Sequence, residues 1–87
     1  ESRMTEEKST HERRRNIIIL IEKYLLTLGY IDAVNRVEQE SNISLQSWDV
    51  ADNVDLYMVV LEFEQYYEMR FGKLPKMVKK QDNVSTS

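Results

Sequence analysis

The residues of this 87-residue sequence whose types can catalyse reactions, chiefly acidic side chains and one histidine, do not form a convergent set. His11, the only histidine, lies in a charged segment without apolar periodicity, where we expect an exposed bystander. The acidic pairs Glu62/Glu68 and Glu38/Glu40 have the chemistry for acid–base catalysis, but carboxylates on polar helix faces are usually solvated charges. The Gly-Lys step of FGKLP lacks the upstream glycine and the following Ser or Thr of a phosphate-binding loop.

The sequence also lacks a set of side chains that could bind a metal ion or a cofactor. The sequence has no cysteine, one histidine and no calcium-type spacing of acidic residues. We therefore expect no catalytic residue, no metal site, no cofactor and no enzyme activity in this segment.

Two basic clusters remain among the charged residues. They are Arg13, Arg14 and Arg15, and then Lys73, Lys76, Lys79 and Lys80. Either they are solvated, solubilising ends, or they are weakly attracted to an acidic polymer in a salt-dependent way. The formal net charge is -3, and neither cluster is interleaved with aromatic residues, so nucleic acid is not an expected partner.

Length and composition favour one small, mostly helical domain. There are only two glycines and one proline, which argues for few tight turns and an all-α fold. The longest apolar run, Ile17 to Ile21, is far shorter than the roughly 20 residues that cross a bilayer, and no secretory signal is visible. We therefore expect a soluble intracellular protein without membrane contact. Because the sequence begins with Glu1 and ends in a polar tail, we also expect it to be a piece of a larger protein.

Apolar spacing predicts a helical hairpin at residues 13–41, preceded by a disordered segment at residues 1–12. At about 100° per residue, the first helix has a broad apolar face and a thin second stripe on its opposite side. The broad face contains Ile17, Ile21, Tyr24, Leu25 and Leu28, flanked by Ile18 and Leu20, and the second stripe contains Ile19 and Leu26.

Gly29 is expected to end the first helix with a positive φ, and Tyr30 completes the turn. Asp32 then falls in the first turn of the second helix, where a negative charge suits the helix dipole. The apolar face of this second helix contains Tyr30, Ala33, Val34 and Val37.

The second half of the chain is predicted to be a connector, a third helix and a tail. Residues 42–52 form an apolar connector, residues 53–71 a helix with Asp52 as its N-cap, and residues 72–87 a basic and polar tail. The third helix carries two apolar stripes, which is typical of a helix between two layers. We expect it to pack on the hairpin of its own or a second protomer through Trp48, Leu56, Val60, Phe63 and Tyr67.

The hairpin has more apolar surface than its short second helix can cover. Fully burying one large aliphatic side chain is worth roughly 1.5 to 3 kcal/mol, so the surplus favours association. The simplest cover is a second copy related by a two-fold axis, which gives a homodimeric four-helix bundle. The expected interface contains Ile17, Ile18, Ile21, Tyr24, Leu25, Leu28, Ala33, Val34 and Val37.

The stretch IIILIEKYLLTLGYIDAVNRVEQES resembles the LisH motif, a short helical dimerisation element. The matching positions are Ile17, Ile21, Tyr24, Leu25, Gly29, Tyr30, Ala33, Val37 and Glu40. The motif usually has a larger residue, often Phe, in place of Val37.

A longer likeness covers roughly residues 13–80. GYIDAVNRVEQES, DNVDL and EFEQYYEMRFGKLPKMVKK resemble the N-terminal region of katanin-like AAA ATPases of the A-like branch, which carries a LisH domain. The resemblance implies a microtubule-severing parent protein whose ATP and Mg²⁺ site lies in an AAA module outside these residues. It also implies dimerisation and localisation to the cytoskeleton: microtubules, centrosome or basal body, and cilium or flagellum. The implied partners are microtubules and katanin-associated proteins.

Two interpretations from different classes stay open. The first is a non-catalytic LisH homodimer. A further contact between dimers, made by Ile19, Leu26 and the second stripe of the third helix, could produce tetramers. The alternative is a monomeric adaptor that binds a partner peptide or a tubulin tail through its third helix and residues 73–80.

Overall fold

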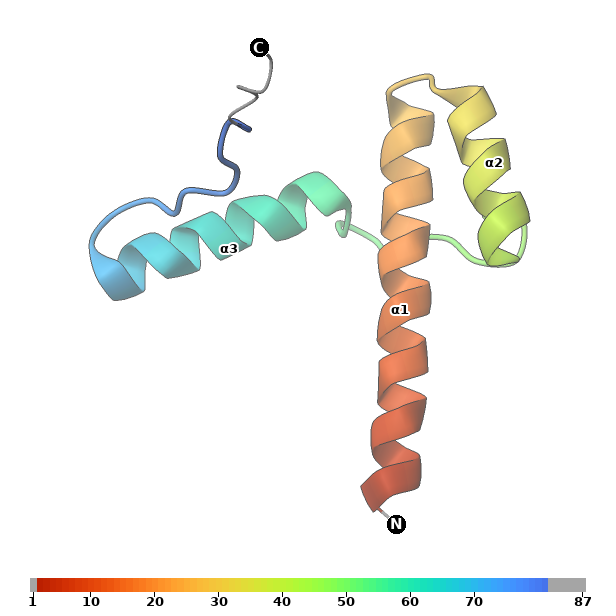
Figure 1. Cartoon of the computed structure of the whole chain (residues 1–87), viewed down its shortest axis with the longest axis horizontal. Helices are drawn as coiled ribbons and strands as arrows, with labels where there is room; N and C mark the ends of the chain where they lie inside the picture. The colour runs from red at the N-terminus through yellow and green to blue at the C-terminus, as the bar shows by residue number, and fades with distance from the viewer. Residues whose placement is uncertain (1, 82–87) are drawn as a thin grey trace.

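The chain folds into three helices. The computed structural model describes residues 2–81, with side chains from residue 6 onward. The helices are α1 (Ser2–Thr27), α2 (Ile31–Ser41) and α3 (Leu56–Phe71). Figure 1 shows α1 and α2 side by side, while α3 extends away from α1 on the other side. The described residues contain no strand, which confirms the all-α expectation.

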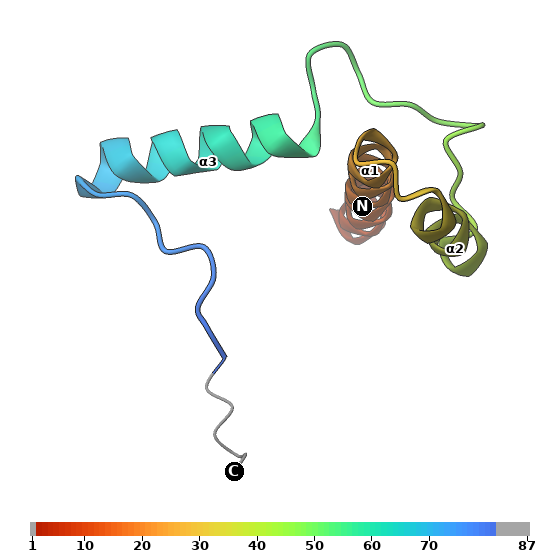
Figure 2. The same ribbon diagram turned by 90° about the horizontal axis from the view of Figure 1, so that it is seen from above.

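The arrangement is open. The radius of gyration is 16.8 Å, whereas a compact domain of this length has a value of about 12 Å. Seen from above in Figure 2, α2 and α3 leave α1 in different directions, and α3 lies against α1 only near its own start. The fold is therefore a hairpin with a projecting arm.

The turn between α1 and α2 depends on Gly29. Its φ is +85°, the left-handed region that glycine adopts without strain. The Tyr30 N–H donates to the Leu25 carbonyl at 2.9 Å and the Gly29 N–H donates to the Leu26 carbonyl at 2.9 Å, which closes the end of α1. The predicted turn at Gly29 and Tyr30 is confirmed, and Asp32 lies in the first turn of α2.

The N-terminal segment differs from its prediction. Residues 2–12 continue α1 as helix, where the sequence predicted disorder. The physical reason is that this segment contains no glycine or proline and several strong helix formers, and it extends a helix that the hairpin already nucleates. Residue 1 lies outside the described residues.

The start of α3 also differs from its prediction. Asp55 is the N-cap, and its carboxylate accepts from the Met58 N–H at 2.7 Å, so the helix begins at Leu56 and not at residue 53. Asn53 has a φ of +62° within a turn in which the Val54 N–H donates to the Ala51 carbonyl at 3.1 Å. This turn prevents a helix from starting at Asp52.

The end of α3 is set by Gly72. Its φ is +75°, and its N–H donates to the Glu68 carbonyl at 2.8 Å. Residues 73–81 continue as irregular chain, and residues 82–87 of the predicted tail lie outside the described residues.

Candidate functional site

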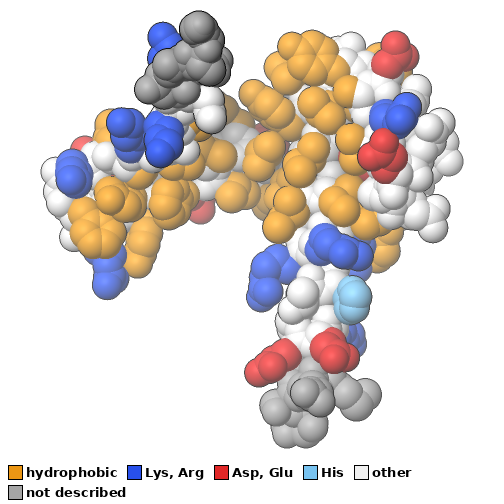
Figure 3. Space-filling view, viewed as in Figure 1, with side chains coloured by type: hydrophobic (Ala, Val, Ile, Leu, Met, Phe, Trp, Pro, Cys, Tyr) orange, Lys and Arg blue, Asp and Glu red, His pale blue; other side chains and the backbone are white. Residues whose placement is uncertain are grey.

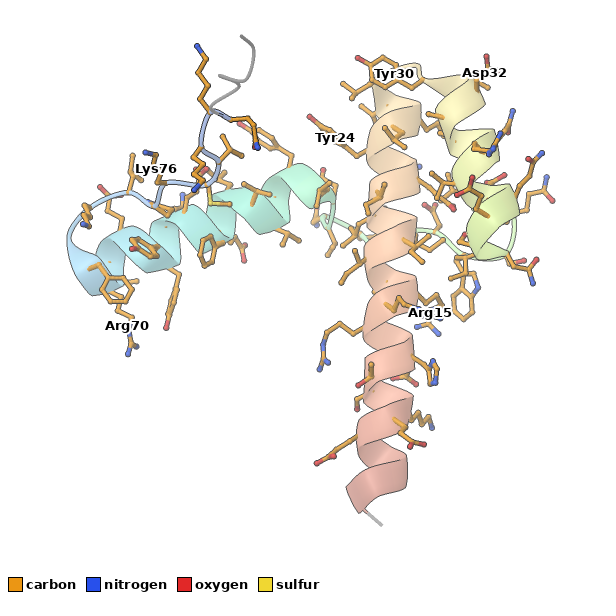
Figure 4. The ribbon with its side chains drawn as sticks, in the orientation of Figure 1. Arg15, Tyr24, Tyr30, Asp32, Arg70 and Lys76 are labelled. Atoms are coloured by element: carbon orange, nitrogen blue, oxygen red, sulfur yellow. The ribbon has the colours of Figure 1, made fainter. Side chains whose placement is uncertain are left out.

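The most prominent feature of the surface is the uncovered side of α1. Ile17, Tyr24 and Leu28 are 48%, 37% and 45% exposed, although the rest of the chain has folded around them. Ile21 is half-buried at the same side. We call Ile17, Ile21, Tyr24 and Leu28 the outer face of α1. In Figure 3 the apolar side chains gather on this part of the molecule, and Figure 4 shows Tyr24 directed away from α2.

The residues predicted for the interface divide into two groups. The outer face is open, as described, and Ala33 is also exposed. Val34 is buried inside the hairpin, and Ile18, Leu25 and Val37 are half-buried. In a single chain Val34 is therefore a core residue of the hairpin and is not available to a partner.

Ile19 was expected on an exposed second stripe of α1, but it lies under the connector. It is buried, so it is not part of a free second stripe that could join dimers into tetramers. The reason is that the connector crosses this side of α1. Ile19, Leu20, Trp48, Val50 and Val54 help to line a cavity of about 420 Å³ between α1 and the connector.

The connector contacts both helices of the hairpin through polar and charged side chains. The Arg15 guanidinium lies 4.0 Å from the centre of the Trp48 ring, and the Lys23 ammonium lies 3.5 Å from the Asp49 carboxylate. The Glu38 carboxylate of α2 accepts from the Leu45 N–H at 3.2 Å. Trp48 therefore anchors the connector on α1, whereas the sequence suggested that it would pack against the third helix.

Glu22 is the residue that reasoning from the sequence missed. Its side chain is fully buried, and neither carboxylate oxygen has a hydrogen-bond partner. Burial raises the pKa of the Glu22 carboxyl above its usual range, and the nearby Glu38 carboxylate raises it further. The signal was present in the sequence, because all four residues three and four positions away are apolar: Ile18, Ile19, Leu25 and Leu26.

The residues predicted to pack the third helix on the hairpin do not do so within one chain. α3 has no buried residue. Leu56, Val60 and Tyr67 are half-buried and Phe63 is exposed. The physical reason is that α3 points away from α1 after its first residues, so most of its length has no neighbouring helix.

The residues with catalytic chemistry are scattered. His11 is exposed on α1, whereas Glu62 and Glu68 are exposed on α3. Among residues 2–81 no group of three or more His, Cys, Asp or Glu side chains could hold a metal ion. No helix in the described part of the chain has the length and apolar character to span a bilayer. The arrangement offers an interaction surface.

Fold and surface together define a small helical module with an uncovered apolar face. Sequence comparison links it to katanin-like proteins: the chain is 50% identical over 80 residues to the A-like 2 form of the katanin p60 ATPase-containing subunit from Xenopus tropicalis. It is 48% identical over 80 residues to the protein of the same name from Xenopus laevis. Each match covers 92% of this chain but only 15% and 16% of the relatives' own lengths. No family model and no solved structure matches the chain.

Proposed function

We propose that this chain is a non-catalytic, LisH-type self-association module of a katanin-like microtubule-severing ATPase. The observation that carries the proposal is the outer face of α1, which remains exposed after α2, the connector and α3 have taken their places. The similarity to the A-like 2 katanin p60 proteins of the two Xenopus species supports the choice of parent protein.

The exposed area also supports association. The chain exposes 7684 Å², whereas a compact monomer of 10.4 kDa exposes about 5,400 Å². Specific interfaces bury about 800 Å² on each partner. The excess is therefore large enough to form one interface.

In the proposed dimer the outer faces of two α1 helices pair about a two-fold axis, with each α2 packed alongside. The result is a four-helix bundle whose folding and pairing are linked, so its apparent stability rises with protein concentration. In the parent protein such pairing would bring two ATPase chains together and help to localise them on microtubule structures. ATP and Mg²⁺ would belong to the AAA module.

The decisive experiment is the mass in solution as a function of concentration. Sedimentation equilibrium should show a monomer–dimer equilibrium for the unmodified chain. Ile17→Asp, which places a charge on the outer face, should shift the chain to monomer, with helix content retained at low temperature and a lowered melting temperature. Ile31→Asp is the matched control, because Ile31 is equally open but lies at the start of α2, where an acidic side chain is tolerated. A chain that stays monomeric at every concentration would exclude the proposal.

The open α3 favours one second candidate, a monomeric adaptor. Its exposed side chains and the lysines of residues 73–80 would then bind an acidic peptide such as a tubulin tail. A stable monomer whose peptide binding is lost when Lys73, Lys76, Lys79 and Lys80 are changed to Ala would favour this candidate over self-association.

A further inference from the structure

Three aromatic side chains of α3, two of them exposed and Tyr67 half-buried, form a continuous row. Phe63, Tyr67 and Phe71 follow one another at intervals of one helical turn, with ring centres 6.0 Å and then 4.6 Å apart. Phe63 and Phe71 are 44% and 55% exposed. We call these three residues the aromatic row. Large aromatic side chains ordered in this way are typical of surfaces that bury themselves against a partner.

The outer face of α1 is too small to form a stable interface by itself. It runs over 12 residues, Ile17 to Leu28, which span about 18 Å at 1.5 Å per residue. A strip of that length and about 10 Å wide gives a footprint of a few hundred Å² at most, against about 800 Å² per partner in a standard interface. Because α3 is about 24 Å long, its apolar side can supply the missing area.

Apolar side chains of the hairpin and of α3 face the same side of the molecule (Figure 3). In the view of Figure 3 the apolar side chains continue from the hairpin onto α3 without an intervening band of charge. The angle between α1 and α3 is open on this side, as the two ribbon views show. A second copy can therefore contact both helices at once.

Within its own chain α3 cannot cover the outer face of α1. α3 begins near α1 and points away from it, so Phe63 lies about 10 Å and Phe71 about 22 Å along the helix from its start. The aromatic row is thus carried away from its own α1. Any helix that covers the row would come from another copy.

The charges beside the two surfaces are complementary. Glu64 and Glu68, one turn apart, flank the aromatic row along one side. Arg13 and Arg14 continue the outer face of α1 one turn toward the N-terminus, and both are exposed. Arg15 is excluded from this role because it contacts Trp48.

We infer that α3 of each protomer lies across α1 of a second copy of this chain, with the aromatic row packed beside the paired outer faces and Glu64 and Glu68 beside the partner's Arg13 and Arg14. The inference rests on the proposed self-association and specifies its geometry. It makes the dimer reciprocal, since each arm completes the interface of the other chain.

A charge exchange between two chains tests this geometry. One variant carries Arg13→Glu and Arg14→Glu, and the other carries Glu64→Lys and Glu68→Lys. Each alone should self-associate roughly tenfold more weakly at low salt, because like charges then face each other across the interface. An equal mixture should recover the unmodified affinity, because in the mixed dimer both contacts again join opposite charges.

Two comparisons make the result decisive. Lys79→Glu with Lys80→Glu alters net charge as much as the arginine variant and should leave self-association within threefold of the unmodified chain. A third variant carries Arg13→Glu, Arg14→Glu, Glu64→Lys and Glu68→Lys in one chain. If self-association recovers in this variant but not in the equal mixture, the charged contact lies within a chain and the inference is overturned. An arginine variant that behaves like the Lys79/Lys80 variant would overturn it as well.

The aromatic row gives an independent measurement. Phe63→Ser, Tyr67→Ser and Phe71→Ser together should weaken the dimer roughly 100-fold or more, because buried aromatic anchors dominate interface energetics. Met69→Ser is the control, since Met69 is exposed on the opposite side of α3. If the unmodified chain dimerises and the triple variant dimerises equally well, only the arm geometry fails; if the unmodified chain is a monomer, the proposed function fails with it.

Discussion

The hairpin and α3 are both helical, but the hairpin buries residues within the chain and α3 does not. The hairpin encloses Ile19, Val34 and Glu22 between α1, α2 and the connector. α3 has a complete set of end signals, with Asp55 at its start and Gly72 at its end, but no buried residue. Good local signals define where a helix begins and ends, whereas a core needs a facing surface. The hairpin has that surface in its own chain, and α3 requires one from elsewhere.

The largest expected effect comes from placing a charge in the hairpin core. Val34→Asp should lower the free energy of unfolding by about 3 to 5 kcal/mol, because the new carboxylate would be buried without a partner one turn before Glu38. Thermal unfolding followed by far-UV circular dichroism measures this change. The same substitution at Val59, an exposed valine of α3, should cost far less if the contrast between the two regions is correct.

The second effect concerns the buried carboxyl of Glu22. Its pKa is raised in the folded chain by burial and by Glu38, so the folded state binds the proton more tightly than the unfolded state. The contribution of Glu22 to the free energy of unfolding is therefore greatest at acid pH and is lost as the pH rises through this raised pKa. Glu22→Gln should flatten that dependence and stabilise the chain at neutral pH, because the glutamine amide carries no charge to bury.

Urea unfolding at several pH values and one protein concentration measures the effect of Glu22→Gln. Glu40→Gln is the control, since Glu40 is exposed and pairs with Arg36 at 2.7 Å, a surface contact worth about 0.5 kcal/mol. Parallel pH curves for the unmodified chain and Glu22→Gln would contradict the assignment.

A matched pair of glycine substitutions compares the two regions directly. Gly29 and Gly72 both have positive φ and open space around an added Cβ, so alanine at either position costs roughly 1 to 2 kcal/mol of backbone strain alone. Gly29→Ala should lower the melting temperature of the hairpin, because its turn joins two packed helices. Gly72→Ala should shorten α3 at its end and leave the melting of the hairpin unchanged. If Gly29→Ala and Gly72→Ala lower the melting temperature equally, α3 and the hairpin unfold as one unit.

The smallest effect tests the start of α3. Asp55→Ala removes the bond to the Met58 N–H and should cost about 1 kcal/mol of helix stability, visible as lost helicity in circular dichroism. Asp52→Ala should change nothing, because Asp52 caps no helix in this structure.

The sequence predicted those parts of the fold that local chemistry decides. Gly29 was expected to end α1 because only glycine adopts a positive φ without strain, and the structure confirms it. The start of α3 was misplaced by three residues, because Asp52 and Asp55 are equally good caps and only the left-handed turn at Asn53 selects between them. Helix-capping propensity alone cannot decide between these two N-cap positions.

The surroundings of each helix were harder to predict from sequence. Glu22 was not singled out from the sequence, because glutamate is almost never fully buried in proteins. Ile19 was assigned to a free stripe because nothing in the spacing of α1 shows where a connector of fourteen residues, 42–55, will cross it. The pairing of the outer face of α1 stays a prediction, since it depends on a surface from a second chain.

The stacking of Arg15 on Trp48 has a practical consequence. Trp48 is the only tryptophan, and its ring lies against Arg15 of α1 at the middle of the connector. Its fluorescence therefore provides an intrinsic optical reporter of connector detachment. Stopped-flow recordings of that emission, set beside the ellipticity of the helices, can time the release of the connector separately from the melting of the arm.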